Sequence, residues 1–267
     1  MTDSVLDIKP KLAFQGYLKR LQNANVADVD TIARIAPQVV RRFRTKAAMP
    51  LEYEKLQQRW RASMRKGSPD YQVYAETLYL ADLWLCWATY SRNYLRGIRS
   101  SPQLSSQLEP VSRITDLGCG CGYTTAALTQ MYPDATVYAT NISDTIQFEI
   151  ASKLGEQYGF SLVPAAHEVP GAQDVVFASE YFEHFEAPID HLNEIVAELR
   201  PRVLVIANAF AADAIGHFDE YRIGFDTRVP CRRMARHFNK RVRALGYRKV
   251  KTKLWNGRPS FWVRDIG

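Results

Sequence analysis

A glycine-rich loop is the part of this sequence whose residue types and spacing most directly suggest chemistry. It runs from Asp116 to Gly122 and reads DLGCGCG, between an expected strand and an expected helix. Glycines at alternate positions let a backbone turn sharply and approach a ligand that a Cβ atom would push away. Because open α/β sheets bind ligands beyond the carboxyl ends of their strands, we expect a small-molecule site at this loop.

Three side chains that are able to take a proton follow a later strand, which is expected to end near Ser179. They are Glu180, Glu183 and His184. A reaction at a hydroxyl or a carbon acid requires removal of a proton, and a histidine has a pKa suited to a general base. We therefore take these three as candidate catalytic residues. The alternative, that Glu183 and His184 only fix their loop through hydrogen bonds, has equal weight at this point.

A repeating pattern that begins at residue 111 positions these residues. Short runs rich in β-branched residues alternate with stretches of helical period, which is typical of a parallel sheet with crossover helices. We expect strands at 111–116, 136–141, 161–164, 174–179 and 203–207, and helices at 123–131, 145–158, 189–199 and 232–245. A final hairpin of residues 248–255 and 260–264 is expected to turn at Asn256-Gly257. This pattern by itself predicts a doubly wound α/β domain.

Residues 1–110 show no strand alternation and are predicted to form a helical region. A polar, proline-flanked connector at 100–110 joins it to the α/β domain at 111–267. Within this region, Ser68-Pro69 indicates the start of a helix that runs to Gly97 and carries a stripe of aromatic residues. Such a stripe can stack on bases, but it is more often core, and we expect core. We also expect the region to border the site and to help select the substrate.

The net charge of +7 is concentrated near the C-terminus. Residues 227–264 hold 13 Lys or Arg and no Asp or Glu, whereas the rest of the chain holds 22 basic and 28 acidic residues. A helix face and the following strand carry the expected basic surface: Arg232, Arg236, Lys240, Arg243, Lys249, Lys251 and Lys253. Such a surface is typical of binding to a polyanion such as nucleic acid. Lysines on an edge strand also block aggregation, so a solvated surface is the other interpretation.

The overall composition excludes several classes of protein. Apolar residues make up 46% of the 267 residues, which is enough for a packed core. No run approaches the roughly 20 apolar residues that a bilayer requires, and no apolar segment near Met1 resembles a secretory signal. We therefore predict a cytoplasmic protein without membrane contact. The four cysteines show neither disulfide nor zinc spacing, and Cys119 and Cys121 are interpreted as small filler residues and not as metal ligands.

The glycine-rich loop resembles motif I of S-adenosylmethionine-dependent methyltransferases, Asp/Glu-x-Gly-x-Gly-x-Gly, and differs from the Gly-x-Gly-x-x-Gly of dinucleotide-binding proteins. Segment 174–185, DVVFASEYFEHF, is similar to strand four of the ubiquinone/menaquinone-type methyltransferases. The resemblance implies a Rossmann-like, seven-stranded class I methyltransferase sheet with an N-terminal helical extension, and S-adenosylmethionine as cofactor. The residues that it assigns to the cofactor are Asp116, Gly118, Cys119, Gly120, Gly122, Asn141, Ile142 and Ser179.

Two of the departures from the family pattern bear on the cofactor. Asn141 stands where an acid normally pairs with the ribose hydroxyls, and Ala165 stands where an acid normally contacts the adenine. An amide without charge assistance is expected to bind more weakly. These departures leave open a protein that binds the cofactor without turnover.

The motifs do not fix the methyl acceptor. The basic surface favours an anionic acceptor, either nucleic acid or a nucleotide, and the ubiquinone-type strand favours a small molecule. The Asn/Asp-Pro-Pro-Tyr/Phe signature of base amino-methyltransferases does not occur after Ser179, where the chain continues EYF. Cys231 follows a proline, as the nucleophile of cytosine-C5 enzymes does, but it lies after the strand at 203–207 and is interpreted as structural.

Overall fold

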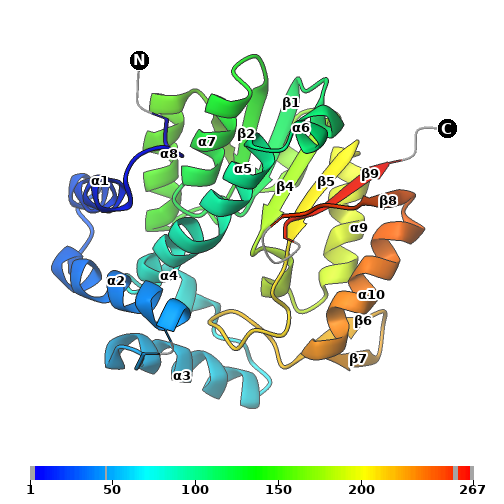
Figure 1. Ribbon diagram of the computed structural model, residues 1–267. Coiled ribbons are helices and arrows are strands. Elements are labelled where there is room, and N and C mark those ends of the chain that lie inside the picture. Colours follow the sequence, from blue (N-terminus) through cyan, green and yellow to red (C-terminus); the bar gives the residue numbers. More distant parts are fainter. Residues whose placement is uncertain (1–3, 46, 255–257, 265–267) are drawn as a thin grey trace.

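A seven-stranded sheet forms the centre of the computed structural model, which describes residues 4–45, 47–254 and 258–264. The strands are β1 (Arg113–Leu117), β2 (Thr136–Thr140), β3 (Ser161–Val163), β4 (Val175–Ser179), β5 (Val203–Ala207), β8 (Tyr247–Val250) and β9 (Ser260–Arg264). Their order in the sheet is β3-β2-β1-β4-β5-β9-β8 (Figure 1). The first five are parallel, and β9 runs antiparallel to both β5 and β8. The expected Rossmann-like sheet with a terminal hairpin is confirmed.

Helices cover both faces of this sheet. The crossover helices are α7 (Tyr123–Met131), α8 (Ile146–Tyr158), α9 (Pro188–Leu199) and α10 (Cys231–Ala244), with 3-10 turns η3 (Ala166–Glu168) and η4 (Phe182–His184). Figure 1 shows α7 and α8 on one side of the sheet and α9 and α10 on the other. Because both faces are covered, the central strands are buried on both sides, and β5 is buried at all five positions. This burial explains why the strands read as apolar runs without alternation.

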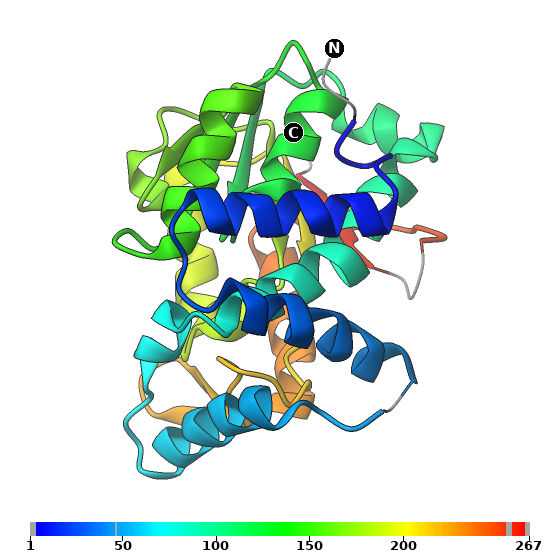
Figure 2. The same ribbon diagram turned by 90° about the vertical axis from the view of Figure 1, so that its left-hand side faces the viewer.

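The described residues before Val111 form a helical layer that packs against the sheet domain. It comprises α1 (Pro10–Asn23), α2 (Val29–Thr45), α3 (Leu51–Arg65), η1 (Tyr71–Ala75), α4 (Tyr79–Leu85), the π-helical η2 (Cys86–Ser91), α5 (Arg92–Arg99) and α6 (Pro102–Leu108). Figure 2 shows α1 lying across this layer, with α2 and α3 further from the sheet. One continuous cluster of buried side chains reaches from Leu21 through Trp84 to Ile114. The helical layer and the sheet therefore share a single core.

The long helix expected from Ser68 to Gly97 is wrong in its continuity. Asp70 caps only the 3-10 turn η1, where its carboxylate accepts the Gln72 N–H at 3.1 Å, and Glu76 is extended with ψ 136°. The Tyr74 carbonyl, which a continuous helix would use internally, accepts a hydrogen bond from Gln147 Nε2 in α8 at 3.1 Å. A tertiary contact therefore interrupts the helix, and no local pattern in the sequence signals that contact.

The strand expected at 248–255 is shorter than predicted. It ends at Val250, whose partner in β9 is Phe261. Pro259 lies two residues before Phe261 and has no N–H to extend the ladder. Lys251 and Lys253 therefore follow the strand instead of alternating along it, and only Lys249 belongs to it. The expected turn at Asn256-Gly257 lies outside the described residues.

A second, two-stranded sheet was not predicted. It pairs β6 (Glu220–Ile223) with β7 (Thr227–Pro230) in an antiparallel hairpin between β5 and α10. Arg228 in this hairpin forms an ion pair with Glu186, so it is not a free part of the basic segment. The helix stripe itself is present: Arg232, Arg236, Lys240 and Arg243 are exposed on α10, opposite the buried Met234, Phe238 and Val242. No helix among the described residues is both long and apolar enough to cross a membrane.

Candidate active site

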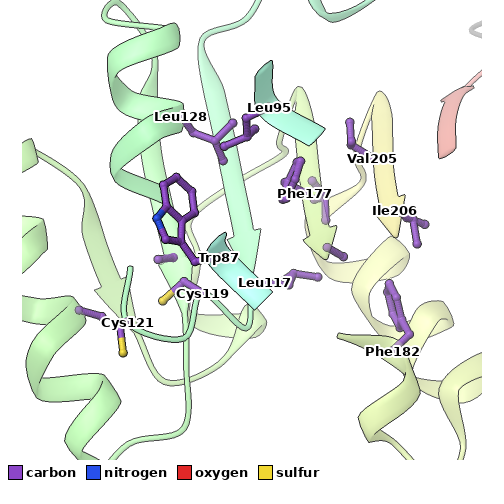
Figure 3. Close-up of a cluster of buried hydrophobic side chains, with 14 of the residues drawn as sticks. Trp87, Leu95, Leu117, Cys119, Cys121, Leu128, Phe177, Phe182, Val205 and Ile206 are labelled. Carbon is purple, nitrogen blue, oxygen red and sulfur yellow. The ribbon is translucent and has the colours of Figure 1, made fainter. Parts of the chain in front are cut away.

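A cavity of about 900 Å³ lies at the carboxyl ends of β1, β2 and β4. The glycine-rich loop forms one wall, and the N-terminal helices form the wall opposite, with Leu83 and Trp84 from α4 and Trp87 from η2. Figure 3 shows Trp87 beside Cys119 and Cys121 of the loop. Many of the lining residues are aromatic: Tyr17, Tyr71, Tyr74, Tyr79, Trp84, Trp87, Tyr123, Tyr181 and Phe185. The expected aromatic stripe is therefore partly core and partly cavity wall.

Left-handed backbone conformations explain the glycines of the loop. Gly118 has φ +63° and Gly120 has φ +55°, values that side-chain-bearing residues rarely adopt. A Cβ at Gly118 would lie 2.5 Å from Cδ2 of Tyr181, and one at Gly120 would lie 3.2 Å from Cδ2 of Leu83. The backbone at both positions thus borders the cavity directly. Gly122 instead packs against Ala151 and Phe160, where it lets α7 approach α8 closely.

Asn141 has a structural reason to be an amide. Its Nδ2 donates to the Gly120 carbonyl at 2.7 Å, and its Oδ1 accepts the Ile142 N–H at 2.9 Å. A carboxylate could accept from Ile142 but could not donate to Gly120. The departure from the family pattern therefore ties the end of β2 to the glycine-rich loop. Ile142 and Ala165 also line the cavity, and Ile142 presents a 53% exposed apolar side chain there.

Asp116 places a buried carboxyl group at the loop end of β1. Its Oδ2 accepts a hydrogen bond from Thr125 Oγ1 at 2.6 Å. Burial raises the pKa of Asp116 to about 7, although the Thr125 hydrogen bond acts in the opposite direction. A cationic ligand beside a carboxyl group with this pKa would stabilise its ionised form. The ammonium and sulfonium groups of S-adenosylmethionine are cationic, so the residues present fit the implied cofactor. Asp116 lines the cavity and is the residue that would hold the ammonium side.

This carboxyl group predicts that cofactor binding depends on pH. Asp116 is protonated below about pH 7 and ionised above it, and the cationic cofactor favours the ionised form. The affinity for S-adenosylmethionine is therefore expected to fall by up to about tenfold per pH unit as the pH decreases below 7. Calorimetry from pH 6 to 8 measures this dependence. Asp116→Asn keeps an acceptor for Thr125 and should bind more weakly without that pH dependence; a wild-type affinity that stays constant over this range contradicts the role.

The three candidate catalytic residues separate into different environments. His184 lines the cavity, and its Nδ1 lies 3.0 Å from the Tyr74 hydroxyl. Burial, with a smaller effect from His217, holds the pKa of His184 well below its usual value, so the ring is neutral at physiological pH. Glu180 also lines the cavity. Glu183 is fully buried, and its carboxylate accepts the Ala209 N–H at 2.5 Å, so any catalytic part must act through a neighbour.

The sequence does not reveal the two residues next to His184, Tyr74 and Gly216. Tyr74 comes from η1, 110 residues earlier in the chain, and belongs to the aromatic stripe that the sequence assigns to the core. Gly216 completes the arrangement, because a Cβ there would lie within 2.2 Å of Tyr74 Oη and 2.4 Å of His184 Nδ1. No local signal marks either residue. Cys231 is partly buried at the start of α10, away from the lining residues, so nothing places it near a reacting atom.

The sheet order, the glycine-rich loop and the cavity at the strand ends agree with the comparison to known families. A family model described as a methyltransferase domain matches residues 115–207. This segment is therefore a methyltransferase domain, and the seven-stranded sheet around it has the class I S-adenosylmethionine-dependent fold.

Individual relatives are distant. Trans-aconitate 2-methyltransferase of Rhodopseudomonas palustris (strain HaA2) is 27% identical over 103 residues, which are 38% of this chain and 40% of that relative. Mitomycin 7-O-methyltransferase MmcR is similar in structure with a TM-score of 0.52 at 13% identity, over 97% of this chain and 73% of the other. PigF, solved with SAH, is similar in structure with a TM-score of 0.53 at 11% identity, over 79% of this chain and 69% of the other. At these identities the two structures support the fold alone.

Proposed function

We propose that this protein transfers the methyl group of S-adenosylmethionine to a small acceptor that is uncharged or bears an amine. The observation that carries the proposal is the composition of the cavity. No lysine or arginine is among the described residues that line it, whereas four carboxyl groups are: Asp116, Asp144, Glu180 and Glu186. Aromatic rings and carboxylates favour apolar and cationic groups and disfavour phosphate. Small-molecule sites of roughly 300–1,000 Å³ are usual, and this cavity is within that range.

The same cavity supplies groups for the transfer. When bound, the cofactor supplies a methyl group on a sulfonium, which is a good leaving group. The protein aligns the acceptor against it and takes a proton from an O–H or N–H nucleophile. Neutral His184, oriented by Tyr74, and Glu180 are two groups on the cavity wall that can take this proton. Asn141 fixes the loop, so the departure that suggested a non-catalytic binding module has a structural explanation.

An anionic acceptor, which the basic C-terminal segment favoured, receives no support from the site. None of the 13 Lys and Arg residues of that segment is among the described residues that line the cavity. Some of these cations serve the fold, since Arg241 donates to Asn193 at 2.6 Å and Arg243 lies 5.2 Å from the Trp262 ring centroid. Binding of a polyanion by the exposed face of α10 stays a prediction, separate from the reaction.

A methyl-transfer assay tests the acceptor class. The protein is incubated with isotopically labelled S-adenosylmethionine and a panel of aromatic amines, aliphatic amines, phenols, carboxylic acids, nucleotides and RNA or DNA oligonucleotides. Mass spectrometry should detect label on an amine or a phenol and none on nucleic acid. Label found only on nucleotides or nucleic acid contradicts the proposal, because the described part of the cavity wall has no Lys or Arg to bind a phosphate.

A further inference from the structure

Glu180 occupies a strained position at the edge of the cavity. It follows the last residue of β4 and has φ +52°, a left-handed conformation that a non-glycine residue rarely adopts. Its N–H donates to the Ala207 carbonyl at 2.7 Å, so the backbone is held in this conformation by the neighbouring strand β5. Strained residues of this kind concentrate at functional sites. Glu180 and the preceding Ser179 both line the cavity.

The carboxyl groups of Glu180 and Glu183 are hydrogen-bonded to each other. Two ionised carboxylates offer only acceptors, so this contact requires a proton on one of them. Glu183 already accepts the Ala209 N–H at 2.5 Å, which favours the ionised form of Glu183. Burial raises the pKa of Glu180 well above its usual value and that of Glu183 to about 7. The shared proton therefore belongs to Glu180.

The carboxyl group of Glu180 is also incompletely satisfied. Its Oε1 is buried and has no hydrogen-bond partner among the described residues. A buried oxygen without a partner is costly, and such atoms in native proteins call for an explanation such as a missing ligand. Glu180 also lines the cavity, so a bound acceptor that carries an O–H or N–H group can donate to its carboxyl group.

We propose that Glu180 and Glu183 form a two-carboxyl relay that removes the proton of the methyl acceptor. The inference rests on the proposed function and deepens it. As the acceptor oxygen or nitrogen forms its bond to the methyl carbon, its O–H or N–H bond breaks and the proton moves to the Glu180 carboxyl group. Glu180 passes its own proton to Glu183, so Glu180 ends in its initial state and Glu183 ends neutral. Glu180 is the catalytic residue of the pair, and Glu183 acts through it.

The groups around the pair fix its pH range. The groups that influence it from the packed elements are Tyr74, Tyr79, Asp82, Cys86, Tyr90, Tyr94, Tyr221 and Arg258. Arg258 stabilises the negative charge of the pair, and Asp82 opposes ionisation of Glu180. The relay works while the pair holds one proton. A second proton, taken up below about pH 7 at Glu183, blocks it, so the transfer rate should fall as the pH decreases through 7.

Three variants test the relay. Glu180→Gln removes the group that contacts the acceptor and should lower kcat/KM by about 10²–10⁴-fold, with cofactor affinity unchanged by calorimetry. Glu183→Gln keeps an acceptor for the Ala209 N–H but cannot take a proton, so the acid limb of the rate profile should move away from pH 7. Glu156→Gln, which removes an exposed carboxyl group of α8, is the control and should leave both properties unchanged.

Infrared spectroscopy gives a readout that does not depend on activity. At pH 8 the wild-type protein should show a protonated carboxyl band that Glu180→Gln lacks and Glu156→Gln retains. If that band is absent, or if Glu180→Gln transfers methyl groups at the wild-type rate, the relay is overturned while the proposed function stands. If the wild-type protein methylates no small acceptor, the proposed function fails and the relay fails with it. With S-adenosylmethionine saturating at every pH, so that Asp116 does not shape the profile, a Glu183→Gln variant that is slower but keeps its acid limb at pH 7 also overturns the relay, because Glu183 is then only structural.

Discussion

Gly120→Val is expected to abolish S-adenosylmethionine binding while the protein stays folded. The backbone of Gly120 has φ +55°, and a Cβ there would lie 3.2 Å from Cδ2 of Leu83, which lines the opposite wall of the cavity. A valine side chain at this place occupies space that the ligand needs, and the loop must shift to relieve its unfavourable φ. Calorimetry with S-adenosylmethionine measures the loss, and circular dichroism with thermal unfolding measures the fold.

Gly159→Val is the matched control for this experiment. Gly159 ends α8 with φ +79°, and a Cβ there meets nothing within 4 Å. Valine at either position therefore carries a similar backbone penalty, of about 1–3 kcal/mol, but only the one at Gly120 enters the cavity. Equal cofactor affinity in the two variants would contradict the assignment of the loop to the cofactor.

Gly216→Ala is expected to impair methyl transfer without affecting the cofactor. Its Cβ would lie 2.2 Å from Tyr74 Oη and 2.4 Å from His184 Nδ1, so these two atoms cannot keep their 3.0 Å contact. Misplacing a group by about 1 Å near the reacting atoms costs about 100-fold in rate. We expect a decrease of that size in kcat/KM for the acceptor, measured with labelled cofactor, and unchanged calorimetric affinity for S-adenosylmethionine.

A second left-handed glycine separates this effect from backbone strain. Gly246 has φ +88°, follows α10, and has nothing within 4 Å of an added Cβ. Gly246→Ala should therefore lose stability by a similar amount and keep its activity. If both variants transfer methyl groups equally well, the Tyr74–His184 pair does not position the acceptor.

Much of the sheet domain was predictable because its signals are local. Residues 123–131 and 203–207 have the predicted bounds, and Thr145 caps α8 as a threonine at a helix start should. The glycine-rich loop was predictable for the same reason, since its conformation depends on residues within one turn of the chain. By contrast, the helix expected from Ser68 to Gly97 is interrupted where the Tyr74 carbonyl accepts from Gln147, and the strand expected at 248–255 ends at Val250, near Pro259, which precedes its partner strand.

The sequence by itself determined the fold class, the glycine-rich loop and the amphipathic face of α10, all of which follow from periodicity or from short motifs. Only the tertiary structure decided how the site is completed. It brought Tyr74 to His184 across 110 residues, set Trp87 against the loop, and left the basic segment outside the cavity. The physical reason is that these contacts depend on the packing of a helical layer against a sheet. Hydrophobic side chains drive that packing without specifying which polar groups will meet.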